Sequence, residues 1–275
     1  MSVFQSIYKR LPAPIRRAVG SLQAKDSSGS APLRPIRIQR IEPGVEASNR
    51  KIDELERMAS EIPSMGGTEI GLHLRKAARQ APAGTSIVEV GSWLGAGTAQ
   101  LALGLREREM AGSVDIYCYD RWEANEPEVA KALRMKNVNF KTGDDTLPWV
   151  MNALRPFAVP ISFVKVDFRD AGWSGGPISV YVDDAAKTPQ KFFHVLKTFG
   201  PHWMPGVTVV VLMDYHYWER TGDDKHKCQK RFVENYRDHF STIENFRFAS
   251  SDAFLYRKKL NFDSLSPRSL QTDAP

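Results

Sequence analysis

Short apolar runs alternate with amphipathic segments through most of this chain. Seven runs with strand-like composition predict strands, at residues 86–90, 114–119, 161–166, 178–182, 207–213, 245–248 and 253–256. Apolar residues at helical spacing predict helices near residues 52–62, 68–78, 98–106, 126–135, 146–154, 188–199 and 224–240. This alternation indicates an α/β fold with a mostly parallel, doubly wound sheet of seven strands, helices on both faces and an antiparallel strand at the C-terminal end.

The two ends of the chain differ from this alternating region. Residues 24–43 are rich in Ser, Gly, Pro and Arg, and residues 263–275 are similar. We therefore expect a basic N-terminal arm and flexible linker over residues 1–44, one folded domain over residues 45–260, and a disordered tail over residues 261–275.

The N-terminal arm carries apolar side chains at helical spacing beside basic ones. Phe4, Ile7, Tyr8 and Leu11 share one face, but Pro12 interrupts the segment early. The pattern leaves two alternatives open, a peripheral contact with an anionic membrane or a partner, and a frayed tail. The sequence also leaves open whether the chain forms a homo-oligomer.

Composition narrows the class of protein. The 275 residues are 42% hydrophobic and 25% charged, which is typical of a globular domain, and no apolar run approaches the roughly 20 residues that span a bilayer. The two cysteines, Cys118 and Cys228, form neither a disulfide framework nor a zinc-binding spacing. We expect a cytoplasmic protein. The net charge of +6 is spread along the chain, which argues against specific nucleic-acid binding.

One stretch, Ser86-Ile-Val-Glu-Val-Gly-Ser-Trp-Leu-Gly-Ala-Gly-Thr98, combines a strand, a glycine-rich turn and a helix start. Gly91, Gly95 and Gly97 lack the Cβ atoms that would keep a backbone away from a ligand. The strand before them carries Glu89. The combination predicts a nucleotide-binding turn.

Carboxylates follow the ends of the predicted strands. Besides Glu89 they are Asp120, Asp167, Asp183, Asp184 and Asp214. Ligands of open α/β sheets bind at the carboxyl ends of the strands, so these carboxylates indicate where the binding site lies. Asp120 follows the glycine turn by about 30 residues, where a carboxylate can accept both hydroxyls of a ribose, which indicates an adenosine-containing cofactor.

Two enzyme families have such a turn. Short-chain dehydrogenases bind NAD(P) and need a Tyr-x-x-x-Lys pair, and no tyrosine here has a lysine at that offset. The motifs more closely resemble the class I S-adenosylmethionine-dependent methyltransferases, through Glu89-x-Gly91 with the later glycines, Asp120, and Met204-Pro-Gly206 before a strand. The likeness covers roughly residues 65–256 and is nearest to the small-molecule and sugar O-methyltransferases.

The resemblance implies a Rossmann-like fold and O-methylation of a saccharide or other small-molecule hydroxyl. It also implies that S-adenosylmethionine contacts the following residues: Glu89, Gly91, Ser92, Trp93, Gly95, Gly97, Thr98, Asp120, Arg121 and Asp167. A non-catalytic nucleotide-binding module and an NAD(P)-dependent oxidoreductase remain alternatives.

The acceptor hydroxyl must lose a proton, and the sequence leaves two solutions open. In one, Mg²⁺ bound by Asp183, Asp184 and Asp214 acidifies the hydroxyl, although Tyr215 stands where metal-dependent relatives carry a further oxygen ligand.

The other solution needs no metal. Here His216 is the general base, or Lys187 with a depressed pKa, and Asp183 lies beside them at a strand end.

Overall fold

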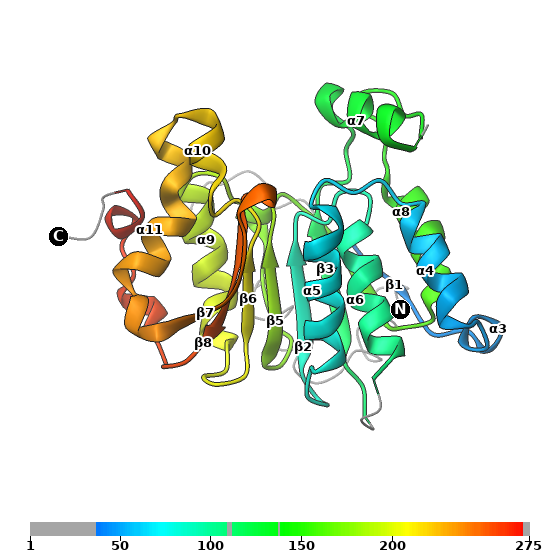
Figure 1. The fold of residues 1–275 in the computed structure, drawn as a ribbon, viewed down its shortest axis with the longest axis horizontal. Helices are drawn as coiled ribbons and strands as arrows, with labels where there is room; N and C mark the ends of the chain where they lie inside the picture. Colours follow the sequence, from blue (N-terminus) through cyan, green and yellow to red (C-terminus); the bar gives the residue numbers. More distant parts are fainter. Residues whose placement is uncertain (1–36, 109–111, 137, 272–275) are drawn as a thin grey trace, which may run out of the picture.

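The computed structural model describes residues 37–108, 112–136 and 138–271 (Figure 1). The predicted amphipathic arm at residues 4–11 lies outside this range. Within it, no helix has the length and apolar character needed to cross a membrane.

One sheet of eight strands forms the centre of the fold, in the order β1-β4-β3-β2-β5-β6-β8-β7. The parallel strands are β2 (Ser86–Val90), β3 (Asp115–Asp120), β4 (Ile161–Lys165), β5 (Ile178–Asp183) and β6 (Val209–Leu212). β8 (Ser251–Tyr256) is antiparallel to both of its neighbours, β6 and β7 (Phe240–Phe246). The chain runs outward from β2 to β4 and then returns to β5, so the strand order reverses between β2 and β5. Ligands bind at such a switch point in open α/β sheets.

The doubly wound, mostly parallel fold is therefore as predicted, with one strand more than expected. β1 (Arg37–Ile41) pairs antiparallel with β4, in the segment predicted as linker. Ile38 is exposed and Ile41 is buried, and Arg40 is ion-paired with Asp115 at 3.2 Å. A five-residue strand with one buried apolar side chain carries little sequence signal, and the free edge of β4 determines its pairing.

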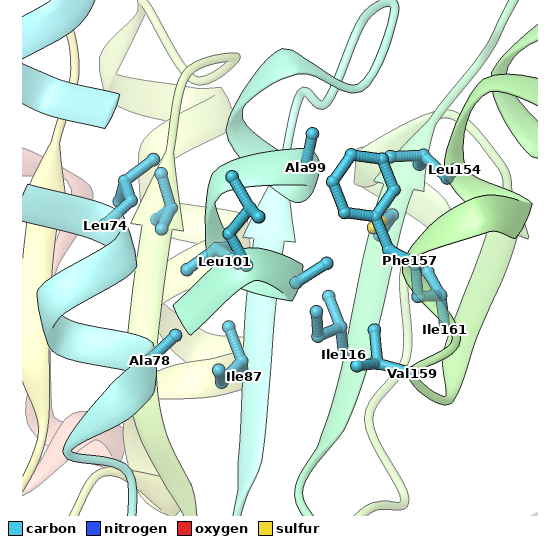
Figure 2. Close-up of a cluster of buried hydrophobic side chains, with 14 of the residues drawn as sticks. Leu74, Ala78, Ile87, Ala99, Leu101, Ile116, Leu154, Phe157, Val159 and Ile161 are labelled. Carbon is cyan, nitrogen blue, oxygen red and sulfur yellow. The ribbon is translucent and has the colours of Figure 1, made fainter. Parts of the chain in front are cut away.

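Helices cover both faces of the sheet (Figure 1). One face packs against α4 (Ile52–Ser60), α5 (Gly67–Arg79), α6 (Ala96–Arg106) and α8 (Leu147–Leu154). The other packs against α9 (Pro189–Phe199) and α11 (Cys228–Asn235). Successive side chains of β2 divide between these layers, because strand residues alternate between faces. Ile87 lies among Leu74, Ala78 and Leu101 of α5 and α6, whereas Val88 faces the second layer (Figure 2).

The other α-helices of the described residues are α3 (Val45–Ser48), α7 (Glu126–Lys136) and α10 (Tyr217–Thr221). α7 protrudes from the body and buries only Ala132 (Figure 1). The long helix predicted at 224–240 is broken, since only Cys228–Asn235 is α-helical.

The segment predicted as a C-terminal tail contributes to the core over part of its length. Phe262, Leu265 and Leu270 are buried in the layer beside α9 and α11. Phe262 packs on Gly200, where a Cβ atom would overlap its ring. These apolar residues are separated by polar ones, so their burial depends on a surface that the rest of the chain supplies.

The contact between α5 and α6 predicts opposite effects for two glycine substitutions. A Cβ atom on Gly104 would overlap the carbonyl oxygen of Arg75 and lie 2.9 Å from Ala78 Cβ, and backbone cannot easily give way. Gly104→Ala should therefore lower the free energy of unfolding by about 1–3 kcal/mol in urea denaturation. In the matched variant Gly71→Ala, the new methyl meets the flexible Gln100 side chain, and a gain of up to about 1 kcal/mol is expected. Equal effects of the two variants would contradict this packing.

Candidate active site

The glycine turn between β2 and α6 is shaped by close contacts within the protein. Gly91 and Gly95 both have φ of +87°, a left-handed backbone that favours glycine. A Cβ atom on Gly91 would lie 2.9 Å from the backbone carbonyl carbon of Asp184, and one on Gly97 would overlap the Glu89 carboxylate. The glycines therefore bring the turn against the end of β5 and bring the start of α6 down onto Glu89.

Glu89 lies beneath the first turn of α6. Its side chain is buried and accepts a hydrogen bond from the hydroxyl of Thr98, which is also buried. Burial raises the pKa of Glu89 to about 7, helped by the negative charge of Asp120 and opposed by the Thr98 hydrogen bond. Glu89 thus packs against the turn from inside the protein. Any effect of Glu89 on a bound ligand would therefore pass through the turn.

Asp120 joins the turn after β2 to the loop after β3. Its two carboxylate oxygens accept the backbone N–H groups of Trp93, at 2.9 Å, and of Trp122, at 2.8 Å. Both tryptophans have left-handed backbones, with φ of +45° and +43°, which is uncommon for bulky residues. Burial raises the pKa of Asp120, while hydrogen bonds from the backbone N–H groups of Trp122, Trp93 and Arg121 oppose that shift. Asp120 therefore stabilises two strained residues, and the carboxylate lone pairs that these donors leave free can accept from a ligand.

The other predicted cofactor residues lie on the same edge of the sheet. The Ser92 side chain is buried, and its hydroxyl has no hydrogen-bond partner within the part of the chain that the structure describes. Arg121 is exposed after β3. Asp167, after β4, accepts the N–H of Arg169 at 3.0 Å and pairs with its guanidinium, which lowers the pKa of Asp167 to about 2. An unpartnered buried hydroxyl in the turn fits a polar ligand group.

Both carboxylate oxygens of Asp183, at the end of β5, accept hydrogen bonds from protein groups. One carboxylate oxygen accepts the N–H groups of Ala185, at 3.1 Å, and Ala186, at 2.9 Å, and the other accepts the Tyr181 hydroxyl at 3.2 Å. The side chain has no exposed surface, and burial raises its pKa to about 6. Asp183 therefore shapes the turn after β5.

The ends of β5 and β6 meet at an ion pair. Lys187 Nζ lies 2.7 Å from each carboxylate oxygen of Asp214 and 3.9 Å from Asp184. Burial alone would lower the pKa of Lys187, but the charges of Asp214 and Asp184 outweigh it and raise the pKa. Burial, and then the charge of Asp214, raise the pKa of Asp184 well above its ordinary value. Lys187 is therefore an ammonium here, contrary to the prediction of a neutral lysine base.

These residues do not fit the predicted magnesium site. Asp183 has its oxygens on protein donors, and the Lys187 ammonium occupies both oxygens of Asp214. Tyr215 is buried against Phe254 and offers no ligand oxygen beside Asp214. Among the described residues, no group of three or more His, Cys, Asp or Glu side chains is arranged to hold a metal ion. We derive no step through Mg²⁺.

His216 lies between two carboxylates. Its Nδ1 is 3.2 Å from Glu219 and its Nε2 is 3.1 Å from Asp252 on β8. The structure therefore pairs both ring nitrogens of the predicted general base with protein groups.

Three residues of the Lys187 surroundings were not predicted. The Tyr217 ring centre lies 4.9 Å from Lys187 Nζ, His226 Nδ1 donates to the Lys187 carbonyl at 2.7 Å, and Gln229 Oε1 accepts the Asp214 N–H at 3.0 Å. All three follow β6 in a polar stretch that looks solvated in the sequence, so only the fold brings them to Lys187.

Comparison with known proteins gives similarities of fold only. No family model and no curated protein sequence matches the chain. The solved structures with a similar fold include CalS11, a calicheamicin methyltransferase, with 14% identity over 92% of this chain and 89% of that one and a TM-score of 0.44.

Two others are S-adenosylhomocysteine-bound. The methyltransferase PaMTH1 of Podospora anserina is 12% identical over 90% of this chain and 98% of its own, with a TM-score of 0.42. A SAM-dependent methyltransferase of Thiobacillus denitrificans is 13% identical over 71% and 73%, with a TM-score of 0.37. These three solved structures are all of methyltransferases.

Proposed function

We propose that this chain is an S-adenosylmethionine-dependent methyltransferase that acts on a hydroxyl of a sugar, glycan or other small molecule. The observation that carries the proposal is the meeting of two loops at the switch point. The glycine turn after β2 and the loop after β3 are joined there by Asp120, and the turn packs directly on Asp184 after β5. A nucleoside bound at these loops would thus share one edge of the sheet with the charges that follow β5 and β6.

The strand order supports a methyltransferase over a dinucleotide-dependent oxidoreductase. Dinucleotide-binding sheets of the doubly wound type continue with parallel strands. Here β8 is antiparallel and inserted between β6 and β7, as expected from the closing hairpin of the methyltransferases that the sequence resembles. The missing Tyr-x-x-x-Lys pair points the same way.

The residues on this edge fit the cofactor. The turn from Gly91 to Gly97 would lie along its methionine part, and this turn carries the Ser92 hydroxyl, which is buried without a partner among the described residues. The remaining lone pairs of Asp120 would accept the ribose hydroxyls, and Arg121 and Asp167 would border the adenine. When bound, S-adenosylmethionine supplies a methyl group activated by the sulfonium sulfur.

Asp184 is the carboxylate that we assign as proton acceptor. It is half-buried, follows β5 beside the glycine turn, and donates its backbone N–H to the carbonyl of Val90 at 2.9 Å. Its raised pKa makes it a stronger base than an ordinary aspartate. Methyl transfer from the bound cofactor would join the methyl carbon to the acceptor oxygen, leave the electron pair of the broken sulfur–carbon bond on sulfur, and release the hydroxyl proton, which Asp184 would accept.

Calorimetry and a transfer assay test this function. The full chain should bind S-adenosylhomocysteine and not NAD, and it should transfer a labelled methyl group from S-adenosylmethionine to at least one member of a panel of sugars and phenols. Ser92→Ala should weaken S-adenosylhomocysteine binding about 3- to 10-fold, the loss of one hydrogen bond, without lowering the melting temperature, because this hydroxyl has no partner among the described residues.

The alternatives give different results. Binding of NAD alone would identify an oxidoreductase. Binding of S-adenosylhomocysteine without transfer to any acceptor would favour a non-catalytic binding module.

A further inference from the structure

A protein ammonium lies where the sequence predicts a metal ion. Lys187 Nζ is 2.7 Å from both oxygens of Asp214 and 3.9 Å from Asp184. Asp184 directly follows β5, next to the glycine turn, and Asp214 follows β6. The cation that neutralises them is thus part of the chain.

The surrounding contacts hold Lys187 from several sides. Asp183 accepts the N–H groups of Ala185 and Ala186 and so shapes the turn that carries Lys187. His226 donates to the Lys187 carbonyl at 2.7 Å. These contacts come from neighbouring and distant parts of the chain, so the ammonium is positioned by the fold and not by its ion pair alone.

Asp214, the ion-pair partner of Lys187, is also held in place by the fold. The Asp214 side chain is only 6% exposed, and its backbone N–H donates to Gln229, which is fully buried. A buried carboxylate needs a charged partner, and removal of that partner leaves an uncompensated charge. Lys187 supplies the partner here.

Within the described residues, the hydrogen bonds to Asp214 leave the ammonium one further N–H donor. Lysine has three N–H groups, and two of them serve the two Asp214 oxygens. The Lys187 side chain is 39% exposed, which leaves its third N–H accessible to a ligand. The Tyr217 ring, 4.9 Å away, provides an apolar surface on one side.

The site lies close to the cofactor turn. The Asp184 N–H donates to the carbonyl of Val90 at 2.9 Å, and Gly91 packs on the Asp184 backbone. Lys187 comes three residues after Asp184. An acceptor oxygen bound by Lys187 therefore lies on the edge of the sheet where the cofactor would bind.

We propose that Lys187 is the resident cation of the acceptor site: its ammonium takes the place of a divalent ion between Asp184 and Asp214 and binds the oxygen of the acceptor hydroxyl. The second half of this inference rests on the proposed methyltransferase function. Methyl transfer by this protein then requires no divalent metal.

The first experiment measures Mn²⁺ binding to the full chain by electron paramagnetic resonance, which requires no knowledge of the acceptor. The wild-type protein should bind no Mn²⁺ at this position, because the oxygens of Asp214 are occupied. Lys187→Ala should expose the two carboxylates and gain a Mn²⁺ site, and Lys187→Ala combined with Asp214→Asn should lose it again. Mn²⁺ binding by the wild-type protein that Asp214→Asn abolishes would overturn the proposal, as would a Lys187→Ala protein that binds none.

The second experiment uses the panel acceptor that the wild-type protein methylates. EDTA should leave the rate unchanged, and Lys187→Ala should lower it about 100-fold or more, which is typical for loss of a charge-stabilising donor. Lys197→Ala, a lysine of α9 that pairs with Asp263, is the matched control and should keep the wild-type rate. A rate within about threefold of wild type for Lys187→Ala would overturn the assignment.

Failure of this inference can be told from failure of the proposed function. Lys187→Ala should bind S-adenosylhomocysteine as the wild-type protein does, since Lys187 lies outside the glycine turn. If the wild-type protein itself bound no S-adenosylhomocysteine, the methyltransferase proposal would fail, whereas the Mn²⁺ experiment would still decide whether Lys187 is the resident cation.

Discussion

Asp120→Asn is expected to lower the free energy of unfolding by about 2–4 kcal/mol and to weaken S-adenosylhomocysteine binding at least tenfold. The Asp120 carboxylate accepts the N–H groups of Trp93 and Trp122, both in left-handed conformations. An amide offers only one acceptor oxygen, so one N–H would face the NH₂ group instead, and hydrogen bonds to charged groups contribute about 1.5–3 kcal/mol each. Urea denaturation followed by circular dichroism measures the stability, and calorimetry measures the affinity.

Asp167→Asn is the matched control, since Asp167 also follows a parallel strand. Its ion pair is with the exposed Arg169 side chain, where solvent screens the attraction, so Asp167→Asn should lower the free energy of unfolding less than Asp120→Asn does. If Asp120→Asn were no more destabilising than Asp167→Asn, Asp120 would not be the group that holds the two tryptophan loops together.

Glu89→Gln is expected to change how stability depends on pH. Burial raises the pKa of Glu89 from its ordinary value of 4.5 to about 7 in the folded protein. Between these values the folded state holds a proton that the unfolded state has released, so stability is lost as pH rises through this window. The shift corresponds to about 3 kcal/mol at most. Glutamine stays neutral and can still accept from Thr98, so the variant should lose this part of the decline.

Denaturation at a series of pH values from 5 to 8 checks this result. The control is Glu107→Gln, because the pKa of Glu107 is lowered by its hydrogen bond with Arg75, so its contribution is lost only on acidification below this range. Glu107→Gln should therefore decline between pH 5 and 8 as the wild-type protein does. An unchanged decline in Glu89→Gln would mean that Glu89 is ionised in the folded state throughout.

The regular part of the fold was predictable from local pattern. The run at residues 86–90 coincides with β2, because an apolar segment ending at glycine has one structural interpretation in an α/β chain. Thr188 followed by Pro189 marks the start of α9 in the same way. β1 and the buried residues near Phe262 escaped prediction, since each depends on a surface made by distant parts of the chain.

The residues of the candidate site were likewise predictable only in part. The sequence predicted that the acidic residues of the site lie at the ends of strands, because the position of a residue after a strand depends only on neighbouring residues. It could not assign their partners. Asp183 and Asp214 look equivalent in sequence, yet the first is saturated by backbone and tyrosine donors and the second binds Lys187.

The sequence by itself determined the α/β alternation, the glycine turn and the edge of the sheet where the charged groups gather, because each follows from neighbouring residues. The tertiary structure alone decided what those groups do. It pairs His216 with Glu219 and Asp252, and it places the Lys187 ammonium on Asp214. Glu219 is a near neighbour of His216, but Asp252 and Asp214 lie far along the chain from His216 and Lys187 and meet them only when the sheet brings β5, β6 and β8 together. A charge in a half-buried site takes its role from the nearest opposite charge.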